Sequence, residues 1–188
     1  MTNEADFICK LIDSKQQDKA YKELIDLYHE RLYWHIRKLV ITHENADDVL
    51  QNTFLRIYKS LPNFKQQSSI HTWMYKIAYN ESLRFLEQNK KKYHTSLDDV
   101  NEKYLENLVD DVFFEGNEIQ LKLQSVLGKL EEKQRQIFQM KYYDNLKFRE
   151  ISDILGIKEG TLKSSYYTVV KNIEKNMLHI ELFEKTKV

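Results

Sequence analysis

Apolar residues recur at intervals of three and four along the first part of the chain, the spacing that gives an α-helix one apolar face. This pattern predicts a helix from about residue 18 to 40, and a second amphipathic helix that ends at Pro62 because proline breaks helices. A third helix is predicted from about Ser69 to Lys90. The side chains expected on or near its buried side are Trp73, Ile77, Tyr79, Leu83 and Leu86. Three helices joined by short loops predict a bundle of roughly 80 residues.

The last part of the chain has the pattern of a helix-turn-helix. Two amphipathic helices come first, over about 119–130 and 137–142. A short amphipathic segment then ends at Gly156, since glycine readily takes the left-handed conformation that a tight turn needs. A longer helix is predicted from about Glu159, and its inner face consists of Leu162, Tyr166, Val169 and Ile173. A short helix, a glycine turn and a longer helix are typical of DNA-binding proteins.

The composition supports an all-α fold with two small helical domains. The 188 residues include one proline and four glycines, which argues against collagen, low-complexity disorder and turn-rich β-sandwiches or barrels. The net charge is zero overall, but residues 1–90 carry +1, residues 91–116 carry −4 and residues 117–188 carry +3. We therefore expect two domains, 1–90 and 117–188, joined by an acidic linker, 91–116. Part of this linker is expected to dock through apolar side chains, which are Leu105, Leu108, Val109, Val112 and Phe113.

Catalytic and metal-binding chemistry finds no support in the sequence. The six histidines lack metalloprotease spacing, and no glycine-rich phosphate-binding loop is present. Cys9 is the single cysteine, so it forms no internal disulfide and no multi-thiolate metal site. We therefore expect no enzymatic activity, no cofactor and no metal. No apolar run approaches the roughly 20 residues of a membrane-spanning helix, and the acidic N-terminus does not resemble a signal peptide, so we expect a cytoplasmic protein.

The predicted outer face of the last helix combines cations with hydroxyl groups. It carries Gly160, Lys163, Ser164, Tyr167, Thr168, Lys171 and Lys175, and the flanking cations are Lys147, Arg149 and Lys158. Such side chains suit the major groove of DNA, where hydroxyls contact base edges and cations contact phosphates. The alternative is a helical hairpin whose outer face is only solvated. Because the face is only mildly basic, we expect weak affinity for DNA from this element alone.

One side of the second predicted helix is polar and includes one apolar residue. The residues on this side are Asp47, Asp48, Gln51, Asn52 and Leu55. A polar face with one exposed leucine is either solvated surface or a docking patch for a partner.

The segment that follows interleaves aromatic residues with cations and amides. Its aromatic residues are Phe64, Trp73, Tyr75 and Tyr79, and its polar ones include Lys65, Ser68, Ser69, Lys76, Asn80 and Arg84. This mixture suits a single-stranded nucleic acid, whose bases stack on aromatic rings while its phosphates meet cations. The alternative is that Trp73 and Tyr79 are ordinary core residues, and for Trp73 we favour this alternative.

Three stretches, in order along the chain, carry a resemblance to a known family. They are ADDVLQNTFLRIYKSLPNF, IHTWMYKIAYNESLRFL and LEEKQRQIFQMKYYDNLKFREISDILGIKEGTLKSSYY. They resemble the sigma-70 family of bacterial RNA polymerase sigma factors, in its short extracytoplasmic-function (ECF) form with regions 2 and 4 alone. The resemblance covers roughly residues 20–90 and 118–176. The chain departs from the family at Asn52, where an acid is common, and in the last helix, where Ser165, Thr168 and Val170 stand in place of frequent arginines.

The resemblance implies an initiation factor, not an enzyme, with region 2 in residues 1–90 and region 4 in residues 117–188. Region 2 is then implied to dock on the clamp coiled coil of the polymerase β′ subunit, and to melt the −10 element and capture its non-template strand. The implied polymerase-binding residues are Asp47, Asp48, Gln51 and Asn52. The implied strand-binding residues are Phe64, Lys65, Ser68, Ser69, Tyr75, Lys76, Tyr79, Asn80 and Arg84.

Region 4 is implied to contact the polymerase β flap and to read the −35 element as duplex DNA. The implied DNA-binding residues are Arg149, Lys158, Lys163, Ser164, Ser165, Tyr167, Thr168 and Lys171. The acidic linker would occupy a basic channel of the polymerase. The resemblance also implies an anti-sigma factor as a partner, one that can hold the protein at the inner membrane, and we expect no stable homo-oligomer.

A different interpretation is an ordinary helix-turn-helix regulator whose N-terminal bundle is a dimerisation or ligand module. That interpretation predicts a stable dimer, because operator-binding proteins commonly use paired half-sites. The sigma-factor interpretation predicts instead that the chain alone binds duplex DNA poorly and starts transcription only together with core polymerase.

Overall fold

The computed structural model describes residues 4–13, 15–40, 42–93 and 118–185, and every regular element within these ranges is a helix. The predicted all-α class is therefore confirmed. The chain divides into two compact units, Met1–Lys91 and Lys92–Val188. The first three residues of the expected linker continue the last helix of the first unit, whereas 94–117, with all the apolar residues expected to dock, lie outside the described residues.

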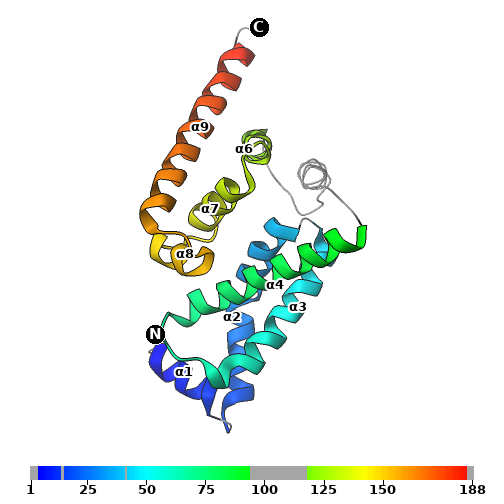
Figure 1. Ribbon diagram of the computed structural model, residues 1–188, viewed down its shortest axis with the longest axis vertical. Helices are drawn as coiled ribbons and strands as arrows, with labels where there is room; N and C mark the ends of the chain where they lie inside the picture. The colour runs from blue at the N-terminus through cyan, green and yellow to red at the C-terminus, as the bar shows by residue number, and fades with distance from the viewer. Residues whose placement is uncertain (1–3, 14, 41, 94–117, 186–188) are drawn as a thin grey trace. The chain divides into compact units, whose positions relative to one another are not determined.

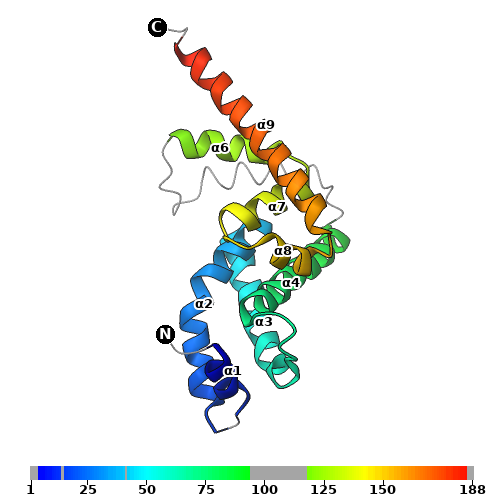
Figure 2. The same cartoon turned by 90° about the vertical axis from the view of Figure 1, so that its left-hand side faces the viewer.

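The first unit is a bundle of three long helices with a short helix at one end. Its helices are α1 (Glu4–Ile12), α2 (Gln17–Val40), α3 (His43–Ser60) and α4 (Ile70–Tyr93), and a 3-10 turn, η1 (Leu61–Asn63), follows α3. Helices α2, α3 and α4 lie side by side in both views (Figures 1 and 2). Helix α1 packs against α2 and η1 through its buried residues Ile8 and Leu11. The sequence pattern did not predict α1, because nine residues are too few to define a helical period.

Helix α3 begins and ends where local chemistry requires it. The Thr42 hydroxyl accepts a hydrogen bond from the backbone N–H of Asn45 at 3.2 Å, which satisfies one of the free donors of the first turn. Pro62 stands in the 3-10 turn that follows, where its ring prevents the α-helix from continuing. Between these ends, α3 buries Val49, Leu50, Thr53, Phe54 and Ile57. These buried side chains fix the orientation of the helix about its own axis.

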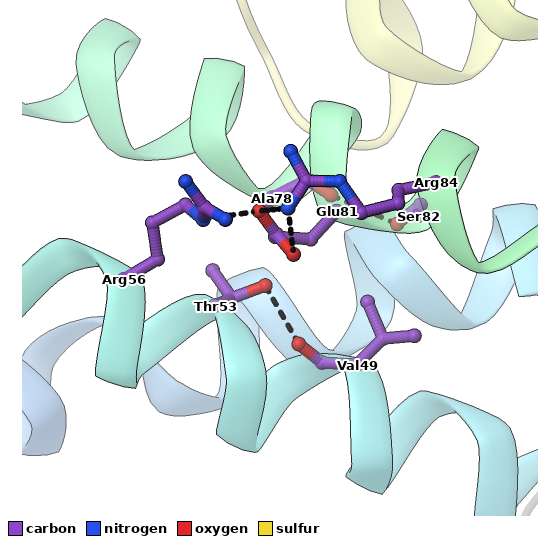
Figure 3. Close-up of polar contacts among 7 residues, drawn as sticks. All are labelled: Val49, Thr53, Arg56, Ala78, Glu81, Ser82 and Arg84. Atoms are coloured by element: carbon purple, nitrogen blue, oxygen red, sulfur yellow. Dashed lines mark hydrogen bonds and ion pairs between the residues drawn. The ribbon is translucent and has the colours of Figure 1, made fainter.

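The buried side of α4 differs from the prediction. Trp73, Ile77, Tyr79, Leu83 and Leu86 are only half-buried, whereas the fully buried positions include Met74, Tyr75, Ala78 and Ser82. Ala78 and Ser82 are too small or too polar for a hydropathy pattern to mark them as core positions, although both are completely buried. Thr53 of α3 and Ser82 of α4 both donate their hydroxyls to a carbonyl four residues back, at 2.7 and 2.9 Å, so neither leaves an unsatisfied polar group in the core (Figure 3).

The second unit consists of four helices: α6 (Glu118–Gly128), α7 (Glu132–Tyr142), α8 (Phe148–Leu155) and α9 (Glu159–Lys185). Helices α6, α7 and α8 all contact α9 (Figure 2). One hydrophobic cluster joins α6, α7 and α9, with Val126, Leu127, Leu130, Phe138, Val169 and Ile173 at its centre. Within the described ranges, no helix has both the length and the apolar character that a membrane span requires.

Helices α8 and α9 form the predicted helix-turn-helix. The side chain of Glu150 accepts a hydrogen bond from the backbone N–H of Lys147 at 2.7 Å and so closes the first turn of α8. Gly156 ends α8 in the left-handed conformation, with a φ angle of 69°, and its N–H donates to the carbonyl of Ser152 at 2.9 Å. This turn sets the direction in which α9 leaves α8.

Alanine substitutions of Gly156 and Gly160 are expected to change stability in opposite directions. A Cβ atom would meet nothing within 4 Å at either glycine, so only the backbone conformation separates the two sites. Gly156→Ala should lower the free energy of unfolding by roughly 1–2 kcal/mol because of its positive φ. Gly160→Ala lies in the first turn of α9 and should raise it by about 0.5 kcal/mol. Urea denaturation of the two variants measures this, and a loss of equal size at both sites would contradict it.

Candidate nucleic-acid interface

The outer face of α9 exposes the residues predicted to bind DNA. Burial of Leu162 and Val169, which are 0% and 1% exposed, fixes the opposite side of the helix against the core. Tyr167 is 57% exposed. The other candidates on this helix, Lys163, Ser164, Thr168 and Lys171, are also exposed, as are Arg149 of α8 and Lys158 of the turn, whereas Ser165 is half-buried.

Two side chains on this face already have local partners. The ammonium group of Lys163 lies 3.3 Å from a carboxylate oxygen of Glu159, one turn earlier, and 5.9 Å from the centre of the Phe148 ring. The hydroxyl of Thr168 donates to the carbonyl of Ser164 at 2.9 Å, so its oxygen lone pairs stay available as acceptors. The face therefore offers oriented side chains, with one of its cations partly neutralised.

A cluster of aromatic side chains lies between the outer face of α9 and the core of the second unit. Tyr166 is half-buried, and its ring lies 6.0 Å from that of Phe138 and 5.7 Å from that of Phe148. Burial is the main cause that raises the pKa of the Tyr166 hydroxyl above its usual value. The ammonium group of Lys141 lies 5.5 Å from the centre of the Phe148 ring and donates to the carbonyl of Leu146 at 3.1 Å. These contacts hold the start of α8 against α9, so the two helices present one surface.

Val170 does not belong to the DNA-facing surface. It stands where the family often has an arginine, and in this chain it is half-buried and packs against the cluster around Val169 and Ile173. Its apolar character is explained by this packing.

In the first unit, the polar side of α3 is exposed as a single face. Asp47, Asp48, Gln51 and Asn52 are all exposed, and Leu55 is 59% exposed. We refer to these five residues as the α3 polar face. None of the ion pairs among the described residues involves Asp47 or Asp48. The face therefore presents two carboxylates that have no ion-pair partner in the described ranges, beside an exposed leucine, which suits a partner surface that is basic and partly apolar.

The predicted strand-binding residues separate into exposed and buried groups. The exposed ones are Lys65, Lys76, Asn80 and Arg84, and the half-buried ones are Ser68, Ser69 and Tyr79. The hydroxyl of Ser69 accepts a hydrogen bond from the N–H of Thr72 at 3.1 Å, so Ser69 also caps α4. In the same loop, Gln66 has a φ angle of 53°, which is strained for a residue with a side chain.

Two of the predicted strand-binding residues are buried, and the prediction needs correction there. Phe64 is 8% exposed and its ring lies 4.8 Å from that of Trp73. Tyr75 is 2% exposed and lies 4.9 Å from the ring of His35 and 4.6 Å from that of His71. Neither residue offers the free ring face that stacking on a base requires. Both are instead part of the core beneath the exposed residues of α4.

Residue-by-residue reasoning missed two side chains beside this surface. Trp73, which we expected in the core, is only half-buried. Arg56 of α3 is exposed, and its Nε atom lies 2.6 Å from Glu81 of α4, next to the predicted residue Arg84 (Figure 3). No local pattern marks Arg56, but its position one turn after Asn52 would have placed it at the edge of the α3 polar face.

In the described part of the chain, no three His, Cys, Asp or Glu side chains gather in a way that could hold a metal ion.

Comparison with known proteins relates both units to regions of the sigma-70 family. Residues 24–92 match Sigma-70 region 2, and residues 120–172 match Sigma-70 region 4. The chain is 26% identical over 176 residues to the ECF RNA polymerase sigma factor SigW of Bacillus subtilis, covering 89% of this chain and 94% of that one. It is 24% identical over 173 residues to the RNA polymerase sigma-H factor of Pseudomonas aeruginosa, covering 84% of this chain and 86% of that one.

A solved structure supports the fold. It is the sigma factor RpoE in complex with the anti-sigma factor NepR from Bartonella quintana. The similarity has a TM-score of 0.65 at 16% sequence identity and covers 85% of this chain and 97% of that one. At this level of identity the likeness concerns the arrangement of helices.

The correction at Tyr75 can be tested by its effect on stability. Tyr75→Ala removes a fully buried ring and should lower the free energy of unfolding by about 3 kcal/mol or more. Asn80→Ala, on the exposed side of the same helix, should change it by less than about 0.5 kcal/mol. Urea denaturation compares the two variants. A similarly small effect at both positions would show that Tyr75 is not buried and would contradict this correction.

Proposed function

This chain belongs to the sigma-70 family, in its ECF group, and from that premise we propose how its two units divide the recognition of a promoter. It is an ECF-type sigma factor, which directs RNA polymerase to start transcription at specific promoters. The proposal is carried by one observation: each of the two matched regions folds as a separate unit that exposes most of its candidate binding residues.

The first unit docks on the polymerase through the α3 polar face. Asp47 and Asp48 meet basic groups of the β′ clamp coiled coil, while Gln51 and Asn52 form hydrogen bonds and Leu55 fills an apolar contact. The exposure of all five residues on one rigid helix supports this assignment. Exposed charges attract a partner at a distance, while the apolar side chain of Leu55 contributes through burial once the surfaces meet.

The first unit also captures the non-template strand of the −10 element. The residues that contact the strand are Lys65, Ser68, Ser69, Lys76, Tyr79, Asn80 and Arg84, which are exposed or half-buried. An unpaired base is held by hydrogen bonds and stacking, while cations neutralise the phosphates on either side. Phe64 and Tyr75 lie beneath this surface and keep α4 and the preceding loop in place.

The second unit reads the −35 element as duplex DNA. Helix α9 enters the major groove with Lys163, Ser164, Ser165, Tyr167, Thr168 and Lys171, while Arg149 and Lys158 contact the phosphate backbone. The hydroxyls and the Tyr167 ring read base edges, and the lysines contribute affinity without sequence choice. Because few cations take part, this contact is weak unless the polymerase supplies the rest of the binding energy.

The remaining partners follow from the same role. Core polymerase provides the catalytic site, so this chain acts as a non-catalytic specificity subunit, and its second unit also meets the β flap. We include an anti-sigma factor among its partners, supported by the complex in which the related fold of RpoE was solved. The cytoplasm is the compartment in which such a protein meets polymerase and DNA. No stable homo-oligomer is required.

Removal of both carboxylates of the α3 polar face should weaken binding to core polymerase. The double variant Asp47→Ala and Asp48→Ala is expected to bind at least about tenfold more weakly, a loss of about 1.4 kcal/mol, because two attractive charges are lost. Glu23→Ala with Asp26→Ala is the matched control, since it removes two exposed carboxylates from α2. Affinity measured with immobilised core polymerase tests the assignment, and equal affinities for the two double variants would contradict it.

Lys163→Ala should reduce the salt dependence of binding to duplex promoter DNA. Holoenzyme with this variant is expected to show a slope of log affinity against log salt that is shallower by about 0.9, the change for one lost phosphate contact. Lys133→Ala, which removes an exposed cation from α7, should leave the slope unchanged. The promoter comes from mapping transcription starts when the protein is overproduced. An unchanged slope for Lys163→Ala would show that this lysine does not contact a DNA phosphate.

A further inference from the structure

A buried carboxylate lies between two arginines where α3 and α4 meet. Glu81 of α4 is 9% exposed, and its Oε1 atom lies 2.6 Å from Nε of Arg56 and 3.1 Å from Nη1 of Arg84. Its Oε2 atom lies 3.3 Å from the same Nη1 atom. Figure 3 shows that Arg56 comes from α3, whereas Glu81 and Arg84 come from α4.

The burial of Glu81 requires cationic partners. A carboxylate removed from water loses hydration energy, which only good ion pairs and hydrogen bonds can offset. Two guanidinium groups share this one carboxylate, so the cluster of three side chains carries a net positive charge. Thr53 and Ser82, two other polar side chains nearby, are neutral and bond to their own helices (Figure 3). Among the described residues no further acidic side chain pairs with Arg56 or Arg84, so the excess positive charge is not cancelled there.

Both arginines remain open to solvent. The side chains of Arg56 and Arg84 are 50% and 48% exposed. Arg56 approaches Glu81 with Nε and Arg84 with Nη1, and neither arginine has another acceptor residue within the part of the chain that the structure describes. A guanidinium group has five donors in a planar fork, which match the oxygens of a phosphate group well.

The shared carboxylate also sets the distance between the two guanidinium groups. Because both contact the same oxygen of Glu81, they lie close enough for one phosphate group to touch both. Arg84 also lies one turn after the exposed Asn80 and two turns after the exposed Lys76 on α4. The pair thus extends the proposed strand-binding surface of α4 across to α3.

We propose that Glu81 is a positioning residue, which holds Arg56 and Arg84 together as one binding site for a backbone phosphate of single-stranded DNA. The inference rests on the proposed function of the first unit and adds two residues, Glu81 and Arg56, to it. Glu81 orients each arginine through one nitrogen and leaves the other nitrogens for the phosphate. The ion pair is thereby retained while the strand is bound.

Binding of the free full-length chain to a fluorescein-labelled single strand of thymidines tests the two arginines. Arg56→Gln and Arg84→Gln should each weaken binding and make its salt dependence shallower. The double variant should lose no more than about 0.7 from the slope of log affinity against log salt, because both arginines serve one phosphate. Arg31→Gln, an exposed arginine of α2, is the control and should leave the slope unchanged. Unchanged binding by both single variants overturns the proposal.

The variant Glu81→Gln tests the role of Glu81, because its affinity for DNA should fall if Glu81 positions the arginines and rise if only the charge of Glu81 matters. Glu81→Gln raises the net charge by one, which by attraction alone would strengthen binding to DNA. We expect it to bind the thymidine strand severalfold more weakly, because the arginines lose their orientation, and we expect Glu81→Asp to restore part of the affinity. Glu87→Gln, an exposed residue of the same helix, should bind as well as the unaltered chain or better. Stronger binding by Glu81→Gln would show that Glu81 competes with the phosphate and would overturn the proposal.

Two further readouts keep these outcomes separate from folding and from polymerase docking. Circular dichroism reports whether each variant folds, and the two single arginine variants remain a sufficient test if Glu81→Gln does not fold, since each of them leaves Glu81 one cationic partner. Affinity for core polymerase is measured in parallel. A loss confined to polymerase binding would mean that the pair contacts an acidic group of the polymerase, and it would also overturn the proposal. Because the strand assay contains no polymerase, its result is independent of the docking test on Asp47 and Asp48.

Discussion

Burial of one side of each helix is the constraint on which both candidate surfaces depend. In α9, Leu162 and Val169 are held in the core, so the opposite side must face solvent along the whole first part of the helix. In α3, Val49 and Ile57 have the same effect on the α3 polar face. Successive exposed side chains are then spaced by the rise of a helix, about 1.5 Å per residue, and not by a flexible loop. Each surface is therefore preorganised, and little conformational entropy is lost when it binds.

The features set by local periodicity and turn chemistry could be predicted from the sequence. The limits of α2, the turn at Gly156 and the inner face of α9 follow from residues within a few positions of one another, so no knowledge of the tertiary fold was needed. The exposure of the α3 polar face and of the outer face of α9 followed directly from the predicted burial of the opposite side of each helix. For the same reason, the short helix α1 could not be predicted, since its nine residues carry too weak a pattern.

The features that depend on contacts between distant segments could not be predicted. Phe64 and Tyr75 look like base-stacking residues in the sequence, and only their packing on Trp73, His35 and His71 shows that they are buried. The ion pair of Arg56 with Glu81 joins two helices and leaves no local pattern. The aromatic and charged residues of this segment could thus be identified as a group, but their division into core and surface required the fold.

We propose that this chain selects promoters only as part of RNA polymerase. The most direct measurement is transcription in vitro with the purified chain, purified core polymerase and a promoter fragment identified from start sites mapped during overproduction. We expect transcripts from the mapped start only when both proteins are present, and little binding of the promoter duplex by the chain alone. Absence of transcription, together with tight binding of the same duplex by a dimer of the free chain, would contradict it.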